Sequence, residues 1–400
     1  MIKTIDECFF QIQNGANIKQ GDIEGGYPIT RIETTANDKF NRDRMGYAGI
    51  TDLLKYESYV LEDGDLLMSH INSVQYLGRT VLYCKQPNET IIHGMNLLRL
   101  KARRDVIDPA YARYCFYGHP FRSQVGNITK KSVNQASFAV KDLKQIKIDI
   151  PSIDEQRKVV AVLDKIQKII DRRNEELNAL DDLIKARFVE LFGDPVHNPK
   201  DWTVKSLGEL SIQINSGNTP KGGEQVYVEK GITFFRSQNV WKDRLEMDDI
   251  AYIDEETHAS MSRSSLKHGD ILMTKTGRIN TENSSLGRAA LYMGEDDAAN
   301  VNGHVYFIRL KPGVNNKFIL RILVSDEYRD YIRSVCVGGI DKRQLNKNHI
   351  EDFPIICPPD DMVDEYISLV EQVDKSKVAV QKALDETQIL FDSLMQKYFG

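Results

Sequence analysis

Few residues of this 400-residue chain have the types and spacing that catalysis requires. Residues 269–275 read Gly-Asp-Ile-Leu-Met-Thr-Lys and offer an aspartate and a lysine of the kind found in nucleases. A similar segment at residues 64–69 is followed by His70 instead of a lysine, and no Glu-x-Lys follows residue 275. Phosphate-binding loops, dinucleotide-binding turns, spaced Cys/His metal sets and the Asn/Asp-Pro-Pro-Tyr/Phe segment of amino-methyltransferases do not occur. We therefore expect the chain not to be an enzyme by itself.

Basic side chains gather in two stretches, although the chain as a whole carries a net charge of −5. Residues 121–148 hold six basic and one acidic residue, and residues 328–349 hold five basic and two acidic ones. A run of like charge is usually a solvated face, and the overall charge does not suggest a nucleic-acid binder. The two stretches nevertheless occupy the same place in two halves of the chain, which favours a function for them.

The chain is an internal duplication. Residues 143–151 return as residues 350–358, an offset of 207 that continues without a gap to Gly400. The segment at residues 64–69 returns at 269–274, and Leu-Gly-Arg at 77–79 returns at 286–288. A repeat of this length predicts two similar domains and not a solenoid of short units.

Composition is that of an ordinary soluble protein, with 28% charged and 41% hydrophobic residues. The five cysteines are odd in number and scattered, without a Cys-x-x-Cys pair, so a disulfide framework is not expected. We expect neither a signal peptide nor a membrane span, and we expect a cytoplasmic protein without membrane contact.

Four blocks follow along the chain, and the predicted fold class is α+β, with two mixed α/β domains and two long helices. We predict a first domain at 1–150, a first helix at 151–193, a linker and second domain at 194–357, and a second helix at 358–400.

Each predicted helix carries a narrow apolar seam. From Val159 to Leu191 apolar residues recur at alternating steps of four and three, with Arg173 and Arg187 in two of the places. Such a heptad seam favours two helices that pair with each other over helices that each pack on their own domain. Because the linker is short, the second helix must return antiparallel, which predicts a rod of roughly 55 Å with one domain at each end and an approximate two-fold axis. A spacing of that order corresponds to about 15 base pairs.

The arrangement resembles the specificity subunit of a type I restriction–modification system, over the whole chain. Leu-Gly-Glu at 207–209 followed by Asn-Ser-Gly-Asn-Thr-Pro at 215–220 resembles the opening of a family target-recognition domain. The repeated segment at 269–274 with Leu-Gly-Arg at 286–288 resembles its core signature. The helix entry at 148–159 and the junction at 191–202 are also similar to the family, whereas residues 14–19 lack the Thr-Pro of the second opening.

The resemblance implies a division of labour. The chain would read a bipartite double-stranded DNA target, one half-site for each domain, with the helices setting a nonspecific gap. Two methylation subunits with S-adenosylmethionine would dock at helix entries 154–163 and 361–370, and restriction subunits with ATP and Mg²⁺ would join for cleavage. The cofactors would then belong to the partners and none to this chain.

Arg, Lys, Asn and Gln side chains are the ones that reach base edges and phosphates of DNA. Two arginines, Arg31 and Arg236, could equally be packed structural residues. Arg79 and Arg288 match each other in the repeat, which suits a phosphate or scaffold role, because domains that read different half-sites should differ where they touch bases. Lys130-Lys131 and Lys342-Arg343 are expected at matching ends of the two basic stretches. The candidate DNA-binding residues are Arg31, Arg79, Lys130, Lys131, Arg236, Gln238, Asn239, Lys275, Arg278, Arg288, Lys342 and Arg343.

Two other interpretations stay open at the level of sequence. One is a coiled-coil adaptor protein with two domains that do not bind DNA. The other is an autonomous enzyme with an unrecognised site, against which the absence of catalytic motifs speaks.

Overall fold

The computed structural model describes residues 1–19, 25–132, 135–279, 281, 283–339 and 341–400. By its internal contacts the chain forms two compact units. Unit 1 comprises Met1–Glu175 and Val380–Gly400, and unit 2 comprises Glu176–Ala379. The two long helices, α5 (Ile153–Phe192) and α11 (Asp360–Phe399), each contribute one part to unit 1 and the other part to unit 2. The domain limits predicted above stay a prediction.

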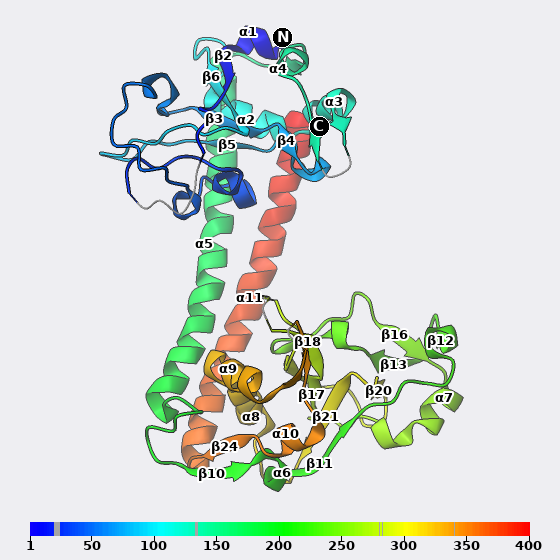
Figure 1. The fold of residues 1–400 in the computed structure, drawn as a ribbon. Helices are drawn as coiled ribbons and strands as arrows, with labels where there is room; N and C mark the ends of the chain where they lie inside the picture. Colours follow the sequence, from blue (N-terminus) through cyan, green and yellow to red (C-terminus); the bar gives the residue numbers. More distant parts are fainter. Residues whose placement is uncertain (20–24, 133–134, 280, 282, 340) are drawn as a thin grey trace. The chain divides into compact units, whose positions relative to one another are not determined.

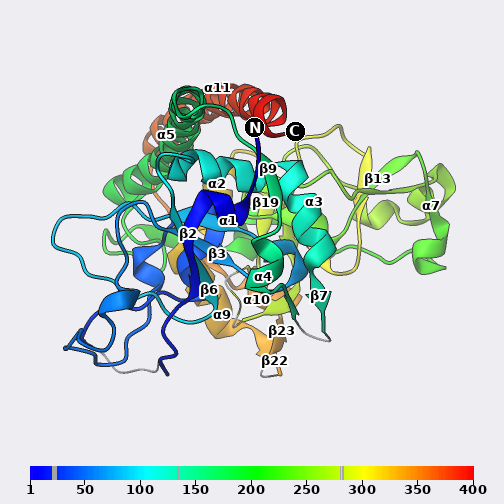
Figure 2. The ribbon, with the colours of Figure 1, turned by 90° about the horizontal axis from the view of Figure 1, so that it is seen from above.

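Unit 1 is built on a four-stranded antiparallel sheet in the order β2-β6-β3-β5. Its inner strands are short apolar runs, and β3 is buried along its whole length. Helix α2 lies between this sheet and the long helices, where Tyr114 donates a hydrogen bond of 2.7 Å to Asp164 of α5 (Figure 2). The elements of the sheet and its cover are β2 (Phe9–Asn14), β3 (Leu66–Ser69), β5 (Thr80–Leu82), β6 (Leu97–Ala102), α2 (Pro109–Tyr117) and α3 (His119–Ile128).

Smaller elements complete the first unit (Figure 1). Strand β1 pairs with β9 where the chain enters α5, and a three-stranded sheet has the order β4-β8-β7. These elements are β1 (Ile2–Thr4), α1 (Ile5–Cys8), β4 (Ile71–Asn72), η4 (Val74–Tyr76), β7 (Lys130–Lys131), β8 (Ala136–Ser137), α4 (Val140–Leu143) and β9 (Lys147–Asp149).

Unit 2 repeats this layout element by element. Its central sheet has the order β11-β21-β17-β19, strand β10 pairs with β24, and a three-stranded sheet has the order β18-β23-β22. The shared elements are β10 (Thr203–Ser206), α6 (Leu207–Leu210), β11 (Ser211–Ser216), β17 (Ile271–Thr274), β18 (Thr276–Arg278), β19 (Ala289–Leu291), β21 (Val305–Leu310), α8 (Asn316–Leu323), α9 (Asp326–Val335), β22 (Val337–Gly338), β23 (Lys342–Gln344), α10 (Lys347–Glu351) and β24 (Pro354–Cys357).

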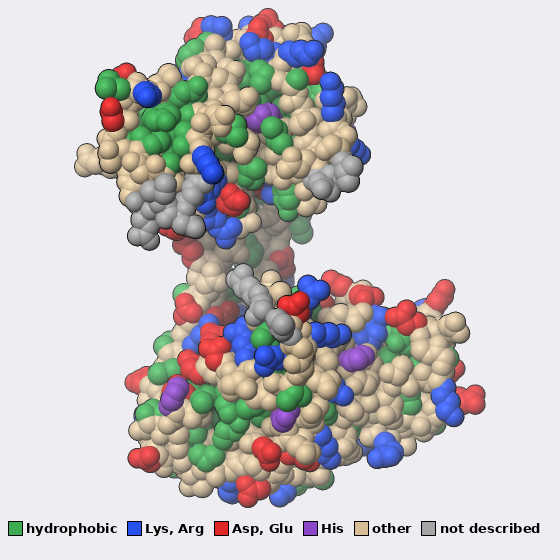
Figure 3. All heavy atoms as spheres, viewed as in Figure 1, with side chains coloured by type: hydrophobic (Ala, Val, Ile, Leu, Met, Phe, Trp, Pro, Cys, Tyr) green, Lys and Arg blue, Asp and Glu red, His purple; other side chains and the backbone are tan. Residues whose placement is uncertain are grey.

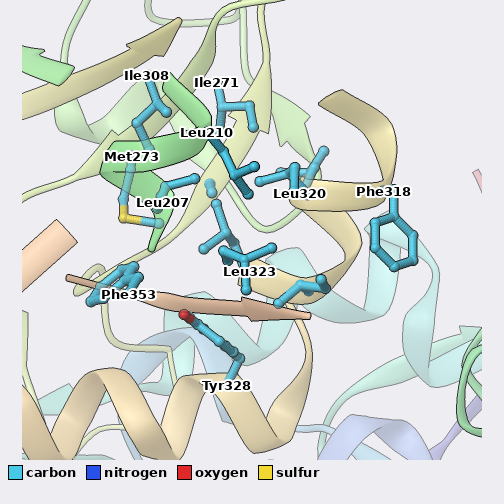
Figure 4. Close-up of a cluster of buried hydrophobic side chains, with 14 of the residues drawn as sticks. Leu207, Leu210, Ile271, Met273, Ile308, Phe318, Leu320, Leu323, Tyr328 and Phe353 are labelled. Atoms are coloured by element: carbon cyan, nitrogen blue, oxygen red, sulfur yellow. The ribbon is translucent and has the colours of Figure 1, made fainter. Parts of the chain in front are cut away.

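The core of unit 2 forms where one face of the central sheet meets α8 and α9. Figure 4 shows side chains from α6, β17 and β21 converging with those of α8 and α9, among them Met273, Leu323 and Tyr328. Tyr328 is fully buried, and its hydroxyl donates a hydrogen bond of 3.0 Å to the carbonyl of Pro354. The apolar face of this sheet therefore fixes α9, which carries Arg329 and Arg333 at the start of the basic stretch.

The units differ in the segment between their first two central strands. In unit 2 this segment contributes to a second sheet, in the order β12-β16-β13-β20. In unit 1 the same place has only isolated bridges among the described residues, such as Ile29 with Gly46 and with Ile92, and 3-10 turns. The reason lies in the sequence: β13 is an apolar Ile-Thr-Phe-Phe run, whereas the equivalent residues 27–30, directly before Arg31, read Tyr-Pro-Ile-Thr, and a proline cannot donate a hydrogen bond to a neighbouring strand. The unit 2 elements are β12 (Tyr227–Val228), β13 (Ile232–Phe235), η6 (Ser237–Asn239), β14 (Val240–Trp241), β15 (Arg244–Leu245), β16 (Ala251–Ile253), α7 (Glu255–Ser260) and β20 (Ala299–Val301).

The long helices run antiparallel to each other in both units. In unit 1 the Arg173 guanidinium donates to the carbonyl of Ala383 and to the hydroxyl of Thr387. In unit 2, Lys377 pairs with Asp181 at 2.5 Å, and Glu365 pairs with Arg187 at 2.6 Å, so residue numbers rise on one helix as they fall on the other. All ten seam positions of α5 are buried or half-buried. The predicted fold class is confirmed: two mixed domains, an antiparallel helix pair and an internal repeat. None of the helices in the described part of the chain is long and apolar enough to cross a membrane.

Candidate nucleic-acid interface

The two small three-stranded sheets carry many of the predicted DNA-binding residues. In unit 1, Lys131 of β7 lies opposite Ala136 of β8. In unit 2, Gly338 of β22 lies opposite Arg343 of β23. Strand β22 follows α9 as β7 follows α3, so β7 and β22 are equivalent strands of the two hairpins. Lys130-Lys131 lie on β7, whereas Lys342-Arg343 lie on β23, the partner strand of β22. The expectation that the two basic pairs lie at matching ends is therefore wrong. At the offset of 207, Lys130 and Lys131 correspond to Val337 and Gly338, and the strand pairing keeps this register in both units.

A polar hollow of about 420 Å³ in unit 2 brings several candidates together. Its walls come from η6, β18, β23 and residues 281 and 283–285, and Arg278 and Lys342 lie exposed at its rim. Figure 3 shows Lys and Arg side chains gathered on this face of unit 2, between α9 and β18. The described lining is almost wholly hydroxyl, amide and cationic: Ser237, Thr276, Gly277, Arg278, Thr281, Asn283, Ser284, Ser285 and Lys342. Such a surface suits base edges and phosphates better than an apolar ligand.

Only one of the three candidates in η6 and its cap is exposed. Asn239 is 1% exposed and donates to the carbonyls of Glu246 and Asp249 at 3.1 and 2.9 Å. Arg236 donates to the Asp249 carbonyl at 2.5 Å and lies 3.1 Å from its carboxylate. Gln238 is exposed and donates a hydrogen bond to the Asp249 carboxylate. The pKa of Asp249 is lowered by this bond and, to a lesser degree, by the hydrogen bond from Arg236. Gln238 is thus the member whose side chain remains available to a ligand.

Unit 1 builds the same turn from different residues. The Arg236 N–H donates to Asn239 Oδ1 at 2.9 Å, and the Arg31 N–H donates to Thr34 Oγ1 at 2.8 Å. Arg31 is half-buried and Thr34 is fully buried. Both arginines therefore open a 3-10 turn whose third residue fixes the backbone.

Of the other lysines and arginines on these strands, two contact a ring or a carbonyl and four are exposed. Lys275 is half-buried with its ammonium 5.8 Å from the centroid of the Tyr306 ring. Arg343 is half-buried and donates to the carbonyl of Cys336 at 3.5 Å. Lys130, Lys131, Arg278 and Lys342 are exposed on their strands.

Arg79 and Arg288 are both held over rings. The Arg79 guanidinium lies 4.6 Å from the Tyr76 ring, and that of Arg288 lies 3.9 Å from the Trp241 ring. Burial, and then the charges of Arg329 and Arg244, lower the pKa of Arg288.

Sequence reasoning missed several residues that the structure places at this interface. Trp241 and Arg244 form a short hairpin beside Arg288, and Arg263 and Lys347 flank a second polar hollow of about 240 Å³ with Asn215. The closely spaced Trp and Arg at 241–244 and the polar run at 215–218 were the available signals. No group of His, Cys, Asp or Glu side chains in the described part of the chain could hold a metal ion.

Comparison with known proteins shows the family. The model of the type I restriction modification DNA specificity domain matches twice, at residues 3–181 and 199–388. The putative type I restriction enzyme MjaX specificity subunit of Methanocaldococcus jannaschii is 25% identical, over 96% of this chain and 92% of that protein. The StySPI specificity subunit of Salmonella potsdam is 22% identical, over 93% of this chain and 81% of that protein.

Solved structures agree in fold. The crystal structure of a type I restriction–modification S subunit from M. genitalium superposes with a TM-score of 0.58 over 100% of this chain and 96% of that one, at 14% identity. A chain from a study of complex assembly and conformational transition of the type I R-M system gives a TM-score of 0.50, at 18% identity over 85% of this chain and 82% of that one. The chain therefore belongs to the type I restriction–modification DNA specificity family: it is a DNA-sequence-recognition subunit of a restriction–modification complex and not itself an enzyme.

Proposed function

We propose that the chain reads a bipartite double-stranded DNA target, with one half-site for each unit. The observation that carries this proposal is that the units share one scaffold but place their exposed cations differently. Lys130 and Lys131 lie on β7 of unit 1, whereas Lys342 lies on β23 of unit 2, the other strand of the equivalent hairpin. A repeated scaffold with different groove-reaching groups suits two different half-sites.

In unit 2 we assign base reading to Gln238, Arg278 and Lys342. They are exposed, they surround or adjoin the polar hollow, and their side chains are of types that donate to base edges. Arg31, Arg236 and Asn239 hold turns in this structure, so we assign them no base contact.

The partners are proposed in finer detail from the family. Two methylation subunits that use S-adenosylmethionine assemble with the chain at the entries of the long helices, 154–163 and 361–370. Restriction subunits that use ATP and Mg²⁺ join them, and the complex works in the cytoplasm on DNA. The gap between the half-sites is fixed by the length of α5 and α11.

The test is to co-express the chain with a methylation subunit from the same organism and to map methylated adenines across the host genome. The expected result is a split motif with two short specific halves around a fixed gap. An Arg278→Gln variant should change the methylated sequence in one half only, and Lys311→Gln, which removes an exposed charge elsewhere on unit 2, should leave the motif unchanged. A contiguous motif, or a change in both halves, would contradict the assignment of one half-site to each unit.

A further inference from the structure

Each unit carries an arginine in a Leu-Gly-Arg turn that lies against a helix. In unit 2 the Gly287 N–H donates to the Thr274 carbonyl at 3.1 Å, and the Thr274 N–H donates back to the Arg288 carbonyl at 2.9 Å. Gly287 has a φ of 67°, and a Cβ at this position would lie 2.9 Å from Ile332 of α9. The turn is therefore fixed against α9, which also carries Arg329.

The side chain of Arg288 is held in one orientation. Its guanidinium stacks on the Trp241 ring, and its Nε and Nη2 donate to the carbonyls of Ser284 and Asn283 at 3.0 and 2.5 Å. In the part of the chain that the structure describes, Arg288 forms no ion pair with a carboxylate. Arg244 lies on the same ring, with its guanidinium 5.3 Å from the centroid. Arg244 and Arg329 thus add positive charge near Arg288, and Arg244 also lies 3.5 Å from the carboxylate of Glu246.

Unit 1 repeats the arginine pair, with an aromatic ring that comes from a different element. Arg79 corresponds to Arg288, and Arg122 on α3 corresponds to Arg329 on α9. Arg122 donates to the carbonyl of Leu77 at 2.5 Å and so holds the turn. The ring under Arg79 is Tyr76 of η4, whereas the ring under Arg288 comes from β14. Because these rings arise from different elements, the common requirement is a fixed arginine and not a duplicated aromatic residue.

We propose that Arg79 and Arg288 each bind a phosphate of the DNA backbone, with the second arginine of each pair adding positive charge beside it. The proposal rests on the function proposed above. Units that read different half-sites differ in their base contacts, whereas the phosphates they meet are identical, so a duplicated cation suits a phosphate. Arg79 has Asp38 at 3.5 Å, so we expect its phosphate contact to be the weaker one.

The test is to measure DNA affinity of the complete methyltransferase complex, carrying Arg288→Gln, across a series of salt concentrations. We expect a loss of about tenfold in affinity, equal on target and non-target DNA, because a phosphate contact carries no sequence information. The slope of log K against log salt concentration should fall by about one, as for one lost phosphate contact. Arg79→Gln should act in the same direction by a smaller factor.

A matched control is Lys311→Gln. Lys311 is exposed and follows β21, whereas the turn of Arg288 lies level with the beginning of that six-residue strand. The two positions are therefore roughly 20 Å apart along the strand. This variant should leave both affinity and salt slope unchanged.

Three results would overturn the proposal. An unchanged affinity of Arg288→Gln would show that the side chain does not contact DNA. A loss confined to target DNA, with relaxed sequence at one position, would identify a base contact instead. The Arg288→Lys variant keeps the positive charge. If its salt slope were as low as that of Arg288→Gln, Arg288 would have a purely structural role. If the wild-type complex binds all DNA sequences equally well, the proposed function is wrong, whereas the assignment of Arg79 and Arg288 to phosphate contacts is not contradicted.

Discussion

Gln156 provides a quantitative test of how α5 is attached to unit 1. It lies in the first turns of α5 and is fully buried. Its amide oxygen accepts from the Asp108 N–H at 2.9 Å, and its amide nitrogen donates to the carbonyls of Val106 and Pro151 at 3.0 and 2.9 Å. The side chain therefore ties the entry of α5 to the start of α2.

Replacing Gln156 by methionine keeps the length of the side chain and removes all three hydrogen bonds. At about 1 kcal/mol for each bond, we expect unit 1 to lose about 3 kcal/mol of stability, because three part-buried backbone groups lose their partner in the fully buried side chain. That loss corresponds to roughly 100-fold faster exchange of the best-protected amides of unit 1. Hydrogen exchange is the suitable assay, since both tryptophans, Trp202 and Trp241, belong to unit 2 and their fluorescence reports on that unit.

Gln388→Met is a matched control. Gln388 of α11 belongs to the same unit, is exposed, and donates to Asp392 at 2.9 Å. The same substitution at this exposed place should change the stability of unit 1 by less than about 1 kcal/mol. A loss below 1 kcal/mol for Gln156→Met would refute the reasoning, because water would then satisfy the freed groups.

Three further predictions concern pH, backbone strain and specificity. Burial, and then the charge of Arg99, lower the pKa of His93 to about 3 from 6.5 in the unfolded chain. Since the unfolded state binds the proton more tightly, unit 1 should lose stability as the pH falls from about 6.5 towards 3, and His93→Gln should flatten this dependence in thermal unfolding measured against pH. Gly287→Ala should destabilise unit 2 by about 2–3 kcal/mol, because it adds both a clash with α9 and strain at φ 67°, and urea unfolding followed by tryptophan fluorescence would measure this loss. The control Gly313→Ala, at φ 86° with open space around it, should cost only about 1 kcal/mol. Equal losses for the two variants would show that the clash is absent. Lys342→Gln should alter one half of the methylated motif, and a uniform fall of methylation at an unchanged motif would instead identify a phosphate contact.

The sequence predicted the parts of the fold that depend on periodicity. The step pattern from Val159 to Leu191 specifies one face of a helix, and those positions are indeed covered. The duplication predicted two equivalent sheets, because the same residues in the same order form the same strands.

Side-chain availability could not be predicted in the same way. Arg236 is paired because Asp249, thirteen residues later, folds back onto it. No pattern in the neighbouring residues predicts this contact. The offset of 207 matches Lys130 and Lys131 with Val337 and Gly338, so the sequence shows that the two basic pairs are not equivalent. That Lys342 lies on the opposite strand of the hairpin follows only from the strand pairing. The stacking of Arg288 on Trp241 joins elements 47 residues apart, so it follows from tertiary structure alone.

The division of each long helix between the units has a consequence for synthesis on the ribosome. Unit 1 takes its last part from residues 380–400, where Phe399 is 7% exposed and packs on Tyr111 with ring centroids 5.1 Å apart. The first part of unit 1 is therefore synthesised long before residues 380–400, which complete it. Tyr111 and its neighbours stay uncovered while all of unit 2 is synthesised. Contacts between residues this distant in the chain form slowly. The nascent first domain is consequently the state in which this protein is most exposed to aggregation and to chaperones.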